Sequence, residues 1–186
     1  ERYHTFRSVV TPFSNTSFGT ALNQNVTFGG TPELIFDGGS GGTEWTGTAI
    51  SGTWDFADAG KVTITSANNN DAAIFDDAGT INMTNYTAIT GKVQLSTYSP
   101  LANSMILQFG LAGVAKGNTI DLNDYIDTGD FAEQSFVIQK QDLGIDNETV
   151  DDMTITITKS SGPKPTIAFD DFQIEETGTP AVFSLF

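Results

Sequence analysis

The stretch "DDMTITITKSSGPKPTIAFDDFQIEE" (residues 151–176) carries the clearest fold signal in the sequence. Apolar residues and threonines alternate from Met153 to Thr158, which is the period-two pattern of a strand with one buried face. A Gly-Pro turn ends this strand, and a second apolar strand follows it. Two adjacent carboxylates, Asp170 and Asp171, interrupt the second strand, although charged side chains are rarely buried without a partner.

Similar strand and turn signals recur throughout residues 31–176. The strand-like segments are "ELIFDGG", "GTWDF", "GKVTITSA", "NNNDAAIFDD", "YTAITGKVQLSTY", "SMILQFGLAG" and "QSFVIQKQDLGI", in addition to the two strands above. About eight or nine strands at such intervals are typical of a β-sandwich. The sequence therefore predicts an all-β fold, a two-sheet antiparallel jelly-roll β-sandwich with an extended N-terminal arm.

The predicted domain organisation has three parts. Residues 1–30 contain irregularly spaced apolar residues and two arginines, Arg2 and Arg7, which is typical of an extended arm rather than of a domain. Residues 31–176 form the jelly-roll domain, and residues 177–186 form a C-terminal tail or an added strand. The arm has two open interpretations: it packs on a neighbouring subunit, or it is an edge strand on its own domain.

Composition excludes several classes of partner. The chain has 23 acidic and 8 basic residues and a formal net charge of −15, so its field repels phosphate backbones and anionic membrane surfaces. No apolar run approaches the roughly 20 residues of a membrane-spanning helix. The absence of cysteine removes disulfides, zinc–thiolate sites and thiol nucleophiles. We expect neither nucleic acid nor membrane as a partner.

The order of the segments carries a resemblance to a known family. "ELIFDGG", "YTAITGKVQL", "SMILQFGLAG", "VDDMTITI" and "IAFDDFQI" together resemble the galactose-binding-like β-jelly-roll of many carbohydrate-binding modules. Modules of this kind also occur in virion surface proteins of tailed phages. The resemblance covers roughly residues 31–176, and it implies a β-sandwich whose common role is sugar binding.

The resemblance also implies a structural calcium ion. In many members of this family, acidic side chains of the first and last strands hold calcium together with backbone carbonyls. Asp37 matches the first position, where the family more usually has Glu, and Asp170 matches the second. Hard oxygen ligands of this type suit calcium. The alternative is that Asp170 caps backbone amides while Asp171 faces solvent.

Catalytic motifs are not evident, so we expect the protein not to be an enzyme. The single histidine, His4, lies in the arm, and no nucleophile-elbow, phosphate-loop or dinucleotide motif occurs. A glycosidase-like pair of carboxylates remains conceivable in so acidic a chain, but nothing in the sequence singles out one pair.

Sugar binding would use exposed aromatic faces for stacking. The candidates are Trp45, Trp54, Tyr86, Tyr98 and Tyr125. Trp45 lies in the Gly-rich loop "GGTEWTGT" and is the most plausible platform, whereas Trp54 fits the edge of the core better. Tyr86 and Tyr98 bracket one strand and fit ordinary packing as well.

Two functions follow from these observations. The preferred one is a non-enzymatic virion structural protein, a capsid decoration, cement or fibre component on a phage particle, whose arm contacts other copies and virion proteins. The alternative is a secreted, extracellular carbohydrate-binding module that binds glycan through exposed aromatics. If the protein is viral, that glycan would belong to the host. The phenylalanine-containing arm favours the first, because a free binding module needs only a flexible linker.

Overall fold

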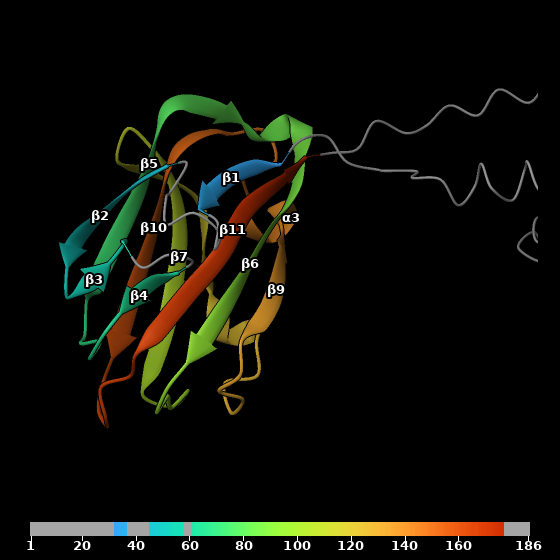
Figure 1. Ribbon diagram of the computed structural model, residues 1–186. Helices are drawn as coiled ribbons and strands as arrows, with labels where there is room; N and C mark the ends of the chain where they lie inside the picture. Colours follow the sequence, from blue (N-terminus) through green and yellow to red (C-terminus); the bar gives the residue numbers. More distant parts are fainter. Residues whose placement is uncertain (1–31, 37–44, 58–60, 177–186) are drawn as a thin grey trace, which may run out of the picture. The chain divides into compact units, whose positions relative to one another are not determined.

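The computed structural model describes residues 32–36, 45–57 and 61–176, and these form two antiparallel β-sheets packed face to face (Figure 1). The predicted jelly-roll β-sandwich is confirmed. Residues Thr31–Thr177 make up one compact unit. The predicted arm (1–30) and tail (177–186) lie outside the described residues, as does Asp37.

Sheet A has the strand order β3-β4-β11-β6-β9, with β1 beside β11. Its strands are β1 (Glu33–Phe36), β3 (Trp54–Asp55), β4 (Val62–Ile64), β6 (Tyr86–Leu95), β9 (Gln134–Gln139) and β11 (Ile167–Glu176). The two short strands β4 and β1 pair successively along one edge of β11, while β6 pairs along the other edge. β11 is therefore the central strand of this layer.

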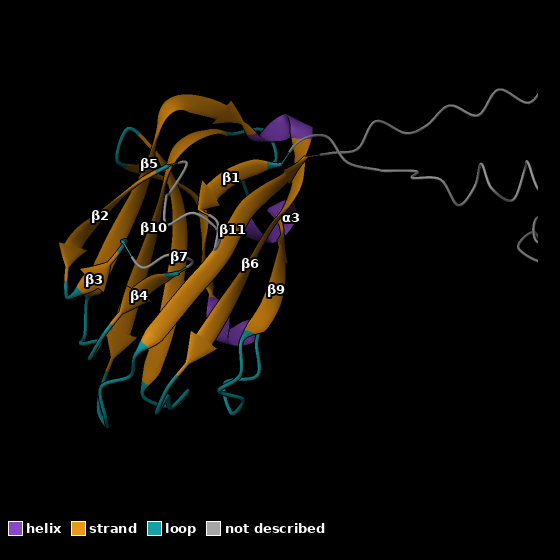
Figure 2. Ribbon diagram, in the orientation of Figure 1, coloured by secondary structure: helices purple, strands orange, loops and turns teal. Residues whose placement is uncertain are grey.

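Sheet B has the order β2-β5-β10-β7-β8. Its strands are β2 (Thr46–Ser51), β5 (Asp71–Asn82), β7 (Asn103–Leu111), β8 (Val114–Asp121) and β10 (Thr149–Lys159). The stretch 151–176 thus contains the central strands of both sheets, and its Gly-Pro turn carries the chain from one layer to the other. In the described ranges, helix is confined to α3 (Lys140–Leu143) and to 3₁₀ turns at Met83–Asn85 and Leu122–Asp124 (Figure 2).

Phenylalanine rings fill the space between the sheets. Phe36 of sheet A stacks on Phe172 of β11 at 4.7 Å between ring centroids and on Phe75 of sheet B at 4.9 Å. Stacked and edge-on ring pairs at such distances add to the free energy gained by burial. The abundance of phenylalanine, 14 residues, is therefore partly explained by the core.

A β-bulge in β11 explains the adjacent carboxylates. Phe169 and Phe172 are three residues apart, yet both are fully buried, which strict alternation would forbid. The pairing register with β6 shifts between Asp170 and Gln173, and Asp171 adopts a left-handed φ of 48°. Asp tolerates this region better than most residues, so the pair supplies the extra residue of the bulge.

Among the described residues, no helix has the length and apolar character needed to cross a membrane.

Candidate functional site

Trp45, the predicted sugar platform, lies in the core. Its side chain is 0% exposed, its ring meets Phe109 edge-on at 6.5 Å, and its Nε1 donates a hydrogen bond to Glu33 Oε1 at 3.3 Å. The expectation that Trp45 presents an exposed face is therefore wrong in this structure. The Gly-rich loop before it suggested exposure, but the ring turns inward, where it gains far more from burial than it would at the surface.

Trp54 closes the edge of the core, as its sequence context favours. The ring is half-buried and lies nearly parallel to the rings of Phe56, at 6.3 Å between centroids, and Phe169, at 6.1 Å. Its Nε1 donates to the Ser51 carbonyl at 2.8 Å. The ring therefore belongs to the edge of the core, packed against two phenylalanines, and is not a fully exposed platform.

The predicted tyrosines also serve packing. Tyr98 is 7% exposed, and its hydroxyl donates to Asn123 Oδ1 at 2.7 Å. Burial raises the pKa of the Tyr98 phenol, because the ionised form would lose hydration. Tyr86 is half-buried against the core at the start of β6. Tyr125 is half-buried against the core, and its hydroxyl donates to Asp142 Oδ2 at 3.4 Å. Since Trp45 and Tyr98 are buried, the five predicted aromatics form no common exposed surface.

Asp170 and Asp171 have different environments. Asp171 Oδ2 pairs with Lys92 Nζ at 2.5 Å, so a cation lies beside the carboxylate pair. Asp170 is 8% exposed, and its Oδ1 is buried with no hydrogen-bond partner among the described residues. Burial, and then the charge of Asp171, raise the pKa of the Asp170 carboxyl.

The exposed side of sheet B presents hydroxyl and amide groups in register. One cross-strand row is Thr48–Ile74–Thr154–Gln108, and the next, about 7 Å along the strands, is Ser51–Ala72–Thr156–Ile106–Asp121. These side chains alternate with buried Met153, Ile155 and Ile157, so they face away from the core. We call the surface formed by Thr48, Ile74, Ile106, Gln108, Thr154 and Thr156 the sheet-B outer face.

Gln108 is held firmly within this face. The β7–β8 register shifts between Leu107 and Phe109, and the Gln108 Nε2 donates to the Lys116 carbonyl at 2.6 Å across the irregularity. Ile74 and Ile106 are half-buried aliphatic side chains beside the threonines. The face therefore offers both hydrogen-bonding groups and apolar contacts, the combination that a sugar ring requires.

Acidic groups close one end of the sheet-B outer face. Asp151 Oδ1 accepts a hydrogen bond from the Ala112 amide at 2.8 Å, and Asp152 Oδ2 accepts one from the Gly113 amide at 3.0 Å. Both amides belong to the β7–β8 turn, whose residues Ala112 and Gly113 have positive φ. These two carboxylates therefore stabilise a hairpin turn.

Charged groups on the outside of sheet A pair with one another. Lys61 Nζ meets Glu133 Oε2 at 2.6 Å, and Lys92 lies between Glu133 and Asp171. Ion pairs of this exposure are worth little to stability. They leave the outside of sheet A with its cations already neutralised.

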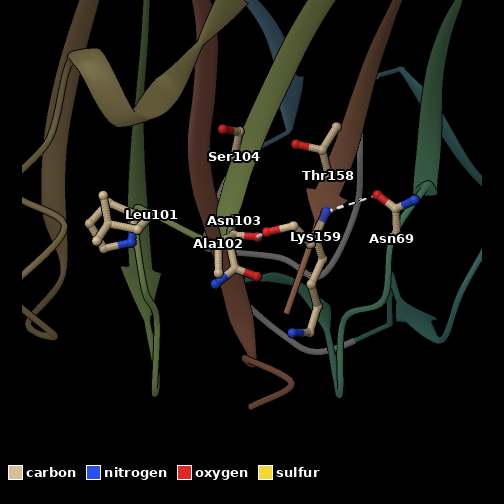
Figure 3. A pocket seen from close by; sticks show the side chains of 9 residues that line it. Asn69, Leu101, Ala102, Asn103, Ser104, Thr158 and Lys159 are labelled. Carbon is tan, nitrogen blue, oxygen red and sulfur yellow. Dashed lines mark hydrogen bonds between the residues drawn. The ribbon is translucent and has the colours of Figure 1, made fainter. Parts of the chain in front are cut away.

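A pocket of about 390 Å³ lies at the end of the β7–β10 ladder that is remote from the acidic turn. Figure 3 shows the side chains that line it. We call it the end pocket. Its lining residues are Asn69, Pro100, Leu101, Ala102, Asn103, Ser104, Thr158, Lys159 and Ser160. The pocket surrounds the last two residue pairs of the β7–β10 ladder, Ser104 with Thr158 and Asn103 with Lys159. The sequence patterns did not mark these residues, since no short motif signals them.

Hydrogen bonds fix the frame of the end pocket. Asn69 Oδ1 accepts from the Lys159 backbone amide at 2.9 Å, the dashed line between these residues in Figure 3. Asn103 Nδ2 donates to the Ser99 carbonyl at 3.0 Å, whereas Asn103 Oδ1 is buried without a partner among the described residues. Lys159 Nζ donates to the carbonyls of Ser161 and Gly162.

Comparison with known proteins yields structural neighbours only. No protein-family model matches the chain, and no curated protein matches it by sequence. A mutant of a carbohydrate binding module of family 29 superposes with a TM-score of 0.53 and 10% identity, covering 83% of this chain and 96% of that chain. The two share a fold. The β-1,2-glucanase from Parabacteroides distasonis gives a TM-score of 0.55 and 14% identity, but the match spans only 27% of that enzyme.

Proposed function

We propose that the protein is a non-catalytic glycan-binding module that binds carbohydrate on the sheet-B outer face. The observation that carries the proposal is the row of Thr48, Ile74, Thr154 and Gln108, which places hydroxyl, amide and aliphatic groups side by side on four strands. The shared fold with a family 29 carbohydrate binding module supports it as an analogy, because fold by itself does not determine function.

Binding on this face would differ from aromatic stacking. The outer-face set contains no aromatic side chain, so affinity would come from hydrogen bonds and from contacts of Ile74 and Ile106 with the apolar side of a sugar ring. Each net hydrogen bond is worth roughly 0.5–1.5 kcal/mol. We therefore propose modest affinity for each sugar and a gain from binding several residues of a polymer at once.

An electrophoretic mobility assay in gels containing soluble polysaccharides tests the proposal. Thr154→Val removes a hydroxyl at constant shape, and we expect it to weaken retardation about two- to tenfold. Thr63→Val, a half-buried threonine on β4 of sheet A, is the matched control and should behave as the wild type. Equal effects of the two variants, or no retardation by any polysaccharide, would exclude this face as the site.

The virion role remains a prediction without structural support. It depended mainly on residues 1–30, which lie outside the described residues, and no comparison points to a phage particle. The structural neighbours favour the carbohydrate-binding alternative instead. Location in a virion or outside the cell, and assembly with other copies, likewise stay predictions.

We also propose that Asp170 contributes to a structural calcium site together with Asp37. A buried carboxylate oxygen without a hydrogen bond, Asp170 Oδ1, fits a metal ligand. Within residues 32–36, 45–57 and 61–176 no group of three or more acidic, histidine or cysteine side chains could hold a metal. The remaining ligands would therefore be Asp37 and backbone carbonyls. The ion would then link the segment after β1, the first strand, to β11, the last strand.

A further inference from the structure

We infer that the end pocket binds a carboxylate-bearing sugar, the uronic acid residue of an acidic glycan. This inference rests on the proposed glycan-binding function and adds a second, charge-selective contact to the neutral sheet-B outer face. The two surfaces meet at the end of the β7–β10 ladder, where Thr158 and Ser104 of the pocket continue the outer face of Thr156 and Ile106. Lys159 and Asn103, the next pair, alternate with them and belong to the core-facing side at the end of the sheet.

Lys159 supplies an ammonium group whose charge is not neutralised. Lys61, Lys92 and Lys116 each pair with a carboxylate. Lys159 forms no ion pair within the described part of the chain, and its Nζ donates only to the Ser161 and Gly162 carbonyls. Neutral carbonyls orient an ammonium but do not cancel its charge, so a carboxylate in the pocket would still be attracted.

The rest of the lining favours an anion as well. None of the nine lining residues is acidic, and Asn69, Ser104, Thr158 and Ser160 carry groups that can donate hydrogen bonds. The net charge of −15 does not prevent binding at physiological salt, because charges farther away than about 8 Å are largely screened. The local lysine therefore decides which ligands enter.

Asn103 is the reason to infer a sugar acid as the ligand rather than a simple anion. The residue is only 3% exposed, and no described residue donates a hydrogen bond to its Oδ1. A buried acceptor without a donor costs free energy and calls for a partner. A uronic acid carries hydroxyls next to its carboxylate, so one molecule supplies the acceptor for Lys159 and, after a small shift of the amide, the donor for Asn103.

The size of the pocket limits the ligand to one or two sugar residues. Its volume of about 390 Å³ lies near the lower end of the roughly 300–1,000 Å³ range of small-molecule sites. A terminal or branching uronic acid fits this limit better than the middle of a long chain.

Two-dimensional NMR of the ¹⁵N-labelled full chain tests the inference with defined probes. The probes are methyl β-glucuronide, methyl β-glucoside and acetate, which separate the carboxylate from the sugar ring. We expect the glucuronide to shift the amide signals of residues 100–104 and 158–160 and to bind about fivefold more tightly than the glucoside or acetate, as one exposed charge pair allows. Raising salt should weaken the binding of glucuronide and of acetate, but not that of the uncharged glucoside.

Variants on the β10–β11 connection identify the charge responsible. Lys159→Gln should lose about fivefold in glucuronide affinity, and Lys159→Arg should keep most of it. Lys164→Gln makes the same charge change outside the lining and should bind as the wild type. The inference would be overturned if the wild type bound glucuronide no more tightly than glucoside, or no more tightly than acetate. It would also be overturned if Lys159→Gln bound glucuronide as tightly as the wild type does. Loss of polysaccharide binding by Thr154→Val but not by Lys159→Gln would support the outer face independently.

Discussion

The carboxylate of Asp152 occupies the space beside Gly110, its direct partner in the β10–β7 ladder. A Cβ placed on Gly110 would lie 2.8 Å from Asp152 Cγ, closer than real Cβ contacts allow. Because Gly110 has no side chain, the Asp152 carboxylate can pack against its Cα and accept the hydrogen bond from the Gly113 amide. The acidic end of the sheet-B outer face therefore depends on a residue without a side chain.

Gly110→Ala should destabilise the protein by about 1–3 kcal/mol, because the new methyl group displaces the Asp152 carboxylate from its turn amide. Urea unfolding followed by circular dichroism measures the change in the free energy of unfolding. Gly79→Ala, at an exposed position on β5, is the control and should cost less than about 0.5 kcal/mol. A Gly110→Ala variant as stable as this control would refute the close contact.

Asp152→Asn should raise the melting temperature at pH 7. Burial first, and then the charges of Asp151 and Asp76, raise the pKa of Asp152 above its usual value near 3.8. The folded state therefore holds a proton more tightly than the unfolded state, and stability falls as pH rises through the raised pKa. An amide at this position stays neutral at every pH and can still accept from Gly113.

The pH dependence provides the check on Asp152. Differential scanning calorimetry should show a gain of about 2 °C for Asp152→Asn at pH 7. The gain should vanish below the usual Asp value near 3.8, where the wild-type carboxyl is protonated in both states. A gain that does not change with pH would mean that the charge of Asp152 is not its cause.

Trp45→Phe should cost about 1–3 kcal/mol of stability and leave glycan affinity unchanged. The smaller ring leaves a cavity in the core and removes the hydrogen bond to Glu33. Chemical unfolding and the polysaccharide gel assay measure the two quantities on the same preparations. If affinity fell while stability held, Trp45 would be a sugar platform after all.

If Asp170 is a calcium ligand, calcium should raise the melting temperature of the wild type. The melting temperature should be about 5–10 °C higher in calcium at 100 times its dissociation constant than in EDTA. Asp37→Asn and Asp170→Asn should abolish the rise. Asp124→Asn, at an exposed position, should keep it.

The sign of the Asp170→Asn effect in EDTA is informative as well. Burial raises the pKa of this carboxyl, so its neutral isostere should stabilise the metal-free protein. A wild type whose melting temperature is the same in calcium and in EDTA would remove the metal proposal.

The sequence by itself determined the sandwich and nine of its strands, but it marked neither β2 (Thr46–Ser51) nor β8 (Val114–Asp121). Alternation between Met153 and Thr158 is a local, period-two signal, because neighbouring side chains on a strand point to opposite faces. The same logic identified residues 31–176 as the sheet-forming part of the chain. It could not assign each strand to a layer, since β10 and β11 are consecutive in sequence but belong to different sheets.

Only the tertiary structure decided which side chains face a ligand. The sequence could not show that Trp45 turns into the core, that Lys92 of β6 meets Asp171 of β11, or that Asn69 joins Lys159 at the end pocket. Each of these contacts joins residues that are distant in sequence, and each depends on the register between strands. A local pattern fixes the two faces of a strand, but the packing of the two sheets determines which groups each face meets.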